Sequence, residues 1–126
     1  MCEVPTMVSA QPRKQRLRAA EADWQQRHRR LAAHVDPALR KKHDWKLPRA
    51  IPLRKGDEVF IARGKFRGRK GKVIGVDTSK GTVTVEGIKI KKTDEKEVAR
   101  PLHPSNLILV SLDETDPRRR DKLLGR

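Results

Sequence analysis

Residues 63–72 read RGKFRGRKGK, and the apolar stretch VIGV follows directly at residues 73–76. Six of these ten residues are Lys or Arg, three are Gly, and none is acidic. A charge run alone usually marks a solvated surface, but glycines also let main-chain N–H groups come close to an anion. We therefore expect this basic segment to form a loop between two strands whose backbone approaches phosphate.

The basic segment supplies candidate contacts to nucleic acid. Each cation can neutralise one phosphate, and such binding is independent of base sequence and weakened by salt. Phe66 either stacks on a base or anchors the loop. The alternative is an exposed hairpin whose charges only keep the chain soluble. The candidate contacts are Arg63, Lys65, Phe66, Arg67, Arg69, Lys70 and Lys72, and the candidate loop hinges are Gly64, Gly68 and Gly71.

The composition restricts the class of protein. With 126 residues the chain has room for one small domain with extensions. Only 35% of the residues are hydrophobic and only 3% are aromatic, so we expect a small aliphatic core and arms that order on a partner. The net charge of +15 makes nucleic acid the first-choice partner. A membrane surface would need an amphipathic helix with large apolar residues, and the chain offers mainly Ala and Leu.

Several classes of site and location are not expected. A single cysteine, Cys2, excludes an intramolecular disulfide and a cysteine-based zinc site. There is no apolar run of about 18 residues and no secretory signal at the start, which favours a cytoplasmic protein without a membrane span. The sequence leaves open whether translation starts at Met1 or Met7.

Enzymatic function is not expected either. His28 and His34 are six residues apart, which is the wrong helical spacing for a shared metal ion. His103 and Ser105 lack an oriented base and an oxyanion loop. The Gly-rich phosphate loops of nucleotide enzymes are absent. We therefore expect no cofactor, no metal and no small-molecule substrate.

Residues 1–52 are expected to form a basic N-terminal arm with short helices. Residues 11–18 read as a basic, extended stretch, and apolar residues then recur at helical spacing. Asp36 as the cap and Pro37 at the first position predict a short helix. The arm is either a disordered tail or an Arg-rich segment that orders on RNA. Its candidate RNA contacts are Arg13, Lys14 and Arg16.

Residues 53–112 predict a mainly β fold. Five short strands are expected, at residues 57–63, 72–77, 82–87, 87–92 and 106–110. Strands this short with tight turns favour a small, strongly bent barrel over an open sheet. Residues 113–126 form a tail whose helix begins at Pro117 with Asp116 as its cap.

A second basic face follows from the alternation in the fourth of these strands. Ile88 and Ile90 lie on one side, and the lysines lie on the other. These lysines either bind RNA or form the solvated side of an edge strand, where lysine discourages edge-to-edge pairing. The residues concerned are Lys89, Lys91 and Lys92.

Residues 53–76 resemble a KOW motif, the Gly-centred strand–loop–strand unit of an SH3-like barrel. Flanking segments are similar to the KOW-bearing large-subunit ribosomal protein of archaea and eukaryotes, the twenty-fourth family of the universal naming. The similarity runs in order through residues 8–120. The segments are SAQPRKQR at 9–16, LAAHVDPALRKK at 31–42, VEGIKI at 85–90 and HPSNL at 103–107.

The resemblance implies a structural protein that binds the 5′ region of large-subunit ribosomal RNA, acts early in assembly and lies near the polypeptide exit tunnel. Neighbouring large-subunit proteins would be further partners. It implies that His103, Pro104, Ser105 and Asn106 hold the turn into the last strand, with the three polar ones near RNA. Trp24 and residues 43–48, which include Trp45, depart from the family pattern.

Two other functions remain open at this point. A KOW module of a transcription elongation factor would require a second domain before the barrel, and residues 1–52 are too polar and basic to form one. An SH3-like peptide-binding module would require an aromatic groove, and the chain has no Tyr.

Overall fold

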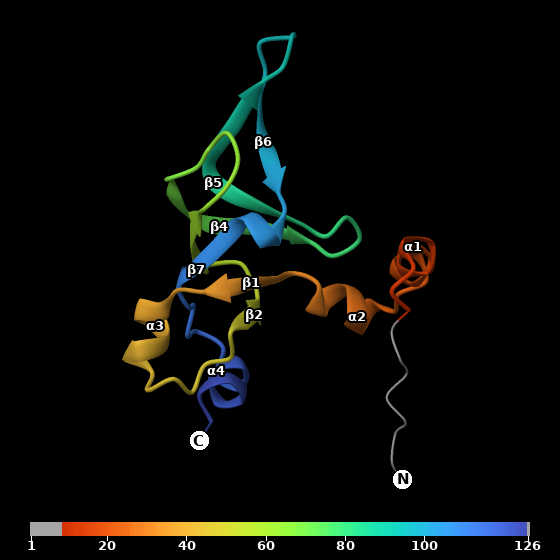
Figure 1. The fold of residues 1–126 in the computed structure, drawn as a ribbon. Coiled ribbons are helices and arrows are strands. Elements are labelled where there is room, and N and C mark those ends of the chain that lie inside the picture. Colours follow the sequence, from red (N-terminus) through yellow and green to blue (C-terminus); the bar gives the residue numbers. More distant parts are fainter. Residues whose placement is uncertain (1–8, 126) are drawn as a thin grey trace.

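The computed structural model describes residues 9–125, in which helices and strands both occur (Figure 1). The choice between Met1 and Met7 and the place of Cys2 lie outside the described residues. The elements, in chain order, are α1 (Pro12–Ala20), α2 (Trp24–Arg29), β1 (Ala32–Val35), α3 (Pro37–Lys42), β2 (Ala50–Pro52), β3 (Glu58–Ile61), β4 (Lys70–Asp77), β5 (Thr82–Lys91), β6 (Glu97–Leu102), the 3-10 helix η1 (Pro104–Asn106), β7 (Leu107–Ser111) and α4 (Pro117–Leu124).

The strands form one sheet in the order β2-β1-β7-β3-β4-β5-β6. Strands β1 and β7 are parallel, and the other neighbours are antiparallel. Within the described residues the two end strands, β2 and β6, do not pair, so the sheet is open. The small, mainly β barrel expected from the sequence is therefore confirmed only in part: the strands and the short C-terminal helix are present, but the sheet is not closed. The predicted strands lie inside a wider sheet, in a fold that mixes helices with strands.

Strand β5 replaces two of the predicted strands. The sequence predicts a break at Gly87, but the strand runs through it. Gly87 has a positive φ of 79°, and the register with β6 shifts between Thr84 and Lys89. The chain therefore bends at this point without ending the strand, and β6 follows it back as one long hairpin (Figure 1).

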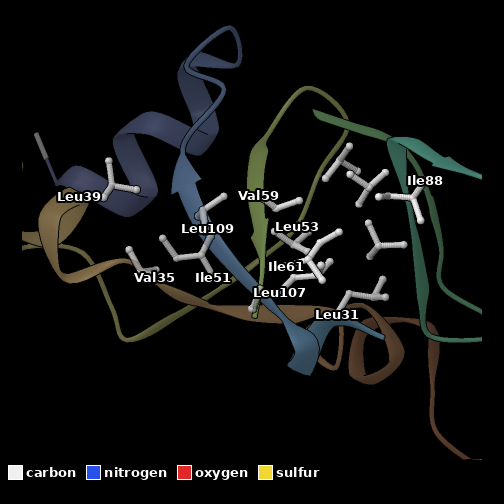
Figure 2. Packing of buried hydrophobic residues seen from close by; sticks show 14 of the residues in the cluster. Leu31, Val35, Leu39, Ile51, Leu53, Val59, Ile61, Ile88, Leu107 and Leu109 are labelled. Carbon is white, nitrogen blue, oxygen red and sulfur yellow. The ribbon is translucent and has the colours of Figure 1, made fainter. Parts of the chain in front are cut away.

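Figure 2 shows the buried core, which is aliphatic as the composition predicts. The predicted alternation is confirmed for Val59 and Ile61 on β3 and for Val83 and Val85 on β5. Seven of the fifteen core residues found in the described part of the chain come from residues 31–53. This part of the N-terminal half therefore packs into the fold, through two strands that the sequence does not predict.

The helix starts follow the predicted caps. The Asp36 carboxylate accepts a hydrogen bond from the Ala38 N–H at the start of α3. The Asp116 carboxylate does the same for Arg118 at the start of α4. In each helix a proline follows the cap, where its missing N–H has no helical partner to lose.

No helix within residues 9–125 has the length and apolar content needed to cross a membrane.

Helix α4 is attached to the sheet by a buried ion pair. The two terminal guanidinium nitrogens of Arg119, Nη1 and Nη2, each donate to one carboxylate oxygen of Asp57 at 2.6 Å, and both side chains are buried. Asp57 also accepts from the backbone N–H groups of Arg54 and Asp113. Asp57 therefore ties the start of β3, the end of β7 and the tail helix together.

Candidate nucleic-acid interface

The basic segment (residues 63–72) forms the loop after β3 and, from Lys70 onward, the start of β4, and backbone hydrogen bonds close the loop. The Ile61 N–H donates to the Arg69 carbonyl at 2.9 Å, and the Gly68 N–H donates to the Ile61 carbonyl at 2.9 Å. Inside the loop, the Arg67 N–H donates to the Gly64 carbonyl at 3.2 Å. These bonds give the segment a defined shape before any partner binds.

The three glycines of the segment have two different roles. Gly64 and Gly68 have φ angles of 102° and 89°, which L-residues with a side chain rarely adopt, and they shape the turn. Gly71 has no such angle, but an added Cβ would lie 2.7 Å from Val85 Cγ1 and 2.8 Å from the Glu86 carbonyl oxygen. The position predicted as a third hinge is thus a point of close packing between β4 and β5.

All six cations of the basic segment are exposed. Among residues 9–125, no carboxylate forms an ion pair with any of them. Their charge is therefore not neutralised within the described part of the chain and remains available to an anion.

Phe66 holds the loop against the fold. Its ring is half-buried and packs against the hydrophobic core. The guanidinium carbon of Arg69 lies 5.5 Å from the ring centroid, within the range of a cation–π contact. Of the two roles considered for Phe66, these contacts favour anchoring.

The structure places the segment from His103 to Asn106 beside the base of the basic segment. The Ala62 N–H donates to the Asn106 carbonyl at 2.9 Å, just before the segment begins. The His103 ring caps η1 by accepting from the Ser105 N–H at 3.2 Å, and its Nδ1 lies 2.7 Å from the Ser105 hydroxyl. The turn into β7 is thus held as the family resemblance implies.

The second basic face lies elsewhere, on the β5–β6 hairpin (Figure 1). Lys89, Lys91 and Lys92 are exposed, but β5 is not an edge strand because β6 pairs with it. The Lys89 ammonium lies 3.4 Å from the Glu97 carboxylate. This face is therefore partly neutralised, unlike the basic segment.

The N-terminal arm is helical where the sequence predicts an extended stretch. Arg13, Lys14 and Arg16 lie on α1, whose nine residues are all exposed. The helix forms because Pro12 suits the first turn and the following Arg, Lys, Gln, Leu and Ala residues favour helices. Arg27 and Arg30 of the next segment donate to carbonyls at the end of α1, which positions it beside α2.

The two tryptophans, which depart from the family pattern and for which the sequence predicts no role, are exposed. Trp24 stacks on His28 with ring centroids 5.4 Å apart. Trp45 lies under Arg40, whose guanidinium carbon is 4.9 Å from the ring centroid. The only sequence signal for either was a tryptophan within a polar, basic segment.

The carboxylates of the tail form no metal site. Asp113 and Asp116 line a hollow near His28 and Arg54. A hydrogen bond from the Thr115 hydroxyl lowers the pKa of Asp113, and one from Arg54 lowers the pKa of Asp116. Within residues 9–125, no three His, Cys, Asp or Glu side chains lie close enough together to hold a metal ion.

Comparison with known proteins assigns the chain to a family. Residues 9–126 match the family described as the ribosomal proteins L26 of eukaryotes and their counterparts in archaea. The chain belongs to this family. As a member of the ribosomal L26 family, it is not an enzyme.

Archaeal relatives in the ribosomal L26 family are similar over nearly their whole length. The large ribosomal subunit protein uL24 of Methanosphaera stadtmanae is 40% identical over 116 residues, covering 92% of this chain and 97% of the relative. The uL24 proteins of Methanothrix thermoacetophila and Methanocella arvoryzae are 39% and 42% identical over 120 residues. These alignments cover 95% and 94% of this chain, and 100% and 94% of the relatives.

Proposed function

We propose that this chain is a structural component of the large ribosomal subunit that binds ribosomal RNA through its basic segment. The observation that carries the proposal is a closed, hydrogen-bonded loop that, together with the start of β4, presents six exposed cations with no ion pair among the described residues. A loop held in shape by the sheet loses little conformational freedom when it binds, so its charge is used efficiently. The names of the archaeal relatives support the assignment to the large subunit.

The proposed contacts extend beyond the basic segment. The turn at His103, Ser105 and Asn106 adjoins the base of the segment, so one RNA strand can contact both. The arm and the β5–β6 hairpin would contact other parts of the RNA. Their proposed contact residues are Arg13, Lys14, Arg16, Lys89, Lys91 and Lys92.

The family resemblance supports a finer proposal. The chain would bind the 5′ region of the large-subunit RNA, join early in assembly, lie near the polypeptide exit tunnel and contact neighbouring ribosomal proteins in the cytoplasm. Its mechanism is phosphate neutralisation by a preformed loop, with no catalysis.

The experiment replaces Arg67, Arg69 and Lys70 with Ala and measures the affinity for protein-free large-subunit RNA across a salt series. Each lost phosphate contact should reduce the slope of log K against log salt by about 0.7–0.9. The variant should therefore bind more weakly and lose about two to three units of slope. It should remain folded, with only the small loss of stability expected from removing the contact between Arg69 and Phe66.

A matched control removes the same charge from α4. Arg118, Arg120 and Lys122 are exposed, and they are not among the proposed contacts. Replacing all three with Ala should leave the slope nearly unchanged. Equal slopes for the two triple variants would contradict the proposal, and so would a wild-type chain that migrates apart from large subunits in a gradient at moderate salt.

A further inference from the structure

Trp45 occupies a backbone position that suits glycine. Its φ is 61°, and the preceding Asp44 has a φ of 52°, so two consecutive residues with side chains are left-handed. Such angles are uncommon outside Gly and Asn, and a bulky residue there is strained. The Trp45 side chain is also 54% exposed, whereas Trp is usually buried over most of its surface.

The strain arises at the end of α3. The Trp45 N–H donates to the Arg40 carbonyl at 2.8 Å, and the Asp44 N–H donates to the Lys41 carbonyl at 3.1 Å. In this type of closure the left-handed position that glycine usually fills is that of Asp44, and Trp45 follows it as a second left-handed residue. Glycine would relieve the backbone at position 45, so the reason for a tryptophan there lies in its side chain.

The indole ring is held in place from one side. The Arg40 guanidinium carbon lies 4.9 Å from the ring centroid. The Arg40 Nε is buried and has no hydrogen-bond partner among the described residues, so the contact with the ring is a principal restraint on this side chain. Leu47, two residues beyond the ring, is buried in the core and fixes the link that carries Trp45.

The segment that carries the ring is cationic rather than apolar. Residues 40–49 contain five Lys or Arg and one acidic residue, Asp44. In the described chain none of the five forms an ion pair. The other large apolar side chains that are exposed in the described chain lie outside this segment. A protein partner would be expected to bind an apolar patch, whereas an isolated exposed ring among cations suits a nucleic acid.

We infer that Trp45 is a stacking platform for an unpaired RNA base, with the exposed cations of residues 40–49 on the adjoining phosphates. Arg40 restrains the ring from one side and adds positive charge beneath it. This inference rests on the proposed RNA-binding function and adds a second contact, outside the basic segment and different in kind. The basic segment neutralises phosphates, whereas Trp45 would recognise that a nucleotide is unpaired.

The first test uses the emission of Trp45 alone. In a Trp24→Phe background, Trp45 is the only tryptophan of the chain. Single-stranded poly(A) should quench its emission, because stacking on a base quenches indole, and a poly(A)·poly(U) duplex should quench it much less. Equal quenching by the two RNAs would overturn the inference.

The second test replaces Trp45 in the full chain. Trp45→Gly should weaken binding to poly(A) by about tenfold, the range seen for loss of one stacked base, without changing the salt slope. Its melting temperature should not fall, because glycine fits the left-handed position. Trp45→Phe should retain most of the affinity.

The outcomes separate this inference from the proposed function. If the parent chain binds RNA but Trp45→Gly binds equally well, only the Trp45 inference fails. If the parent chain does not bind RNA at low salt, both fail. If Trp45 emission changes only when the chain joins large subunits, and not with protein-free RNA, a ribosomal protein covers the ring and the inference is overturned.

Discussion

Gly71 is a residue of β4 at which β5 leaves no room for a side chain. Two atoms of β5, Val85 Cγ1 and the Glu86 carbonyl oxygen, occupy the place where a Cβ would stand. The carbonyl belongs to the backbone and cannot move aside without disturbing the strand pairing. The glycine is therefore needed for β4 to pack against β5 at the point where the basic segment joins the sheet.

We predict that Gly71→Ala destabilises the fold by about 1–3 kcal/mol, because overpacking displaces neighbouring atoms. The free energy of urea unfolding measures the effect. Gly75→Ala on the same strand is the matched control, since an added Cβ there meets nothing within 4 Å. That control should be neutral or stabilising by about 0.5–1 kcal/mol. Equal stabilities of the two variants would show that β4 and β5 do not approach in this way.

At the scale of elements, α4 depends on one side chain for its attachment. Arg119 reaches the buried Asp57 carboxylate with two nitrogens and also donates to the Pro52 carbonyl at 3.1 Å. Removing the arginine leaves a buried carboxylate with only its two backbone donors, those of Arg54 and Asp113. A buried charge without its partner is strongly destabilising.

Arg119→Ala should therefore cost about 3–5 kcal/mol in the free energy of unfolding. The neighbouring Arg120 is exposed and forms no ion pair in the described chain, so Arg120→Ala should change stability by less than about 0.5 kcal/mol. Chemical denaturation of the two variants compares them directly. A small loss for Arg119→Ala would mean that the ion pair does not hold the tail.

The elements with local causes are the ones that the sequence predicts. The caps Asp36 and Asp116 directly precede their helices. The buried valines of β5, Val83 and Val85, are only two positions apart in the sequence. Strand β1 was missed because its small residues read as helix, and β2 because it has only three residues and ends at a proline. All six residues of β6 are polar or at least partly exposed, so it has no apolar alternation to detect.

The candidate site divides in the same way. The basic segment is visible in the sequence because ten consecutive residues carry the signal. The pairing of Asp57 with Arg119 joins residues 62 positions apart, and no local pattern indicates it. The position of the Trp45 side chain depends on a left-handed backbone at the end of α3. The sequence does not indicate this conformation, because no glycine stands there.

For the whole molecule, net charge and carboxylate pairing together determine acid stability. Three carboxyl groups among residues 9–125 have a lowered pKa: Asp77 through the Ser79 hydroxyl, Asp113 through the Thr115 hydroxyl, and Asp116 through Arg54. In the unfolded chain each titrates near its ordinary pKa of about 3.9. Each group therefore stabilises the fold above that pH, and the contribution is lost as the pH falls through the lower folded pKa.

The melting temperature should accordingly be steady near neutrality and fall below about pH 4. Protonation also raises a positive charge that is already +15, which adds repulsion in the compact state. Thermal unfolding between about pH 7 and pH 2 measures the effect. Ser79→Ala should reduce the contribution of Asp77 to the fall in melting temperature. A melting temperature that rises below about pH 4 would contradict the prediction.

The last strand of the described residues lies inside the sheet, between β1 and β3. Strand β7 pairs in parallel with β1 and antiparallel with β3, and the Asp36 N–H donates to the Leu109 carbonyl at 2.9 Å (Figure 1). The β1–β7 contacts join positions more than 70 residues apart. Closing so long a loop costs conformational entropy before the contacts stabilise the fold. During translation the β1–β2 hairpin therefore cannot join the rest of the sheet until β7 has emerged.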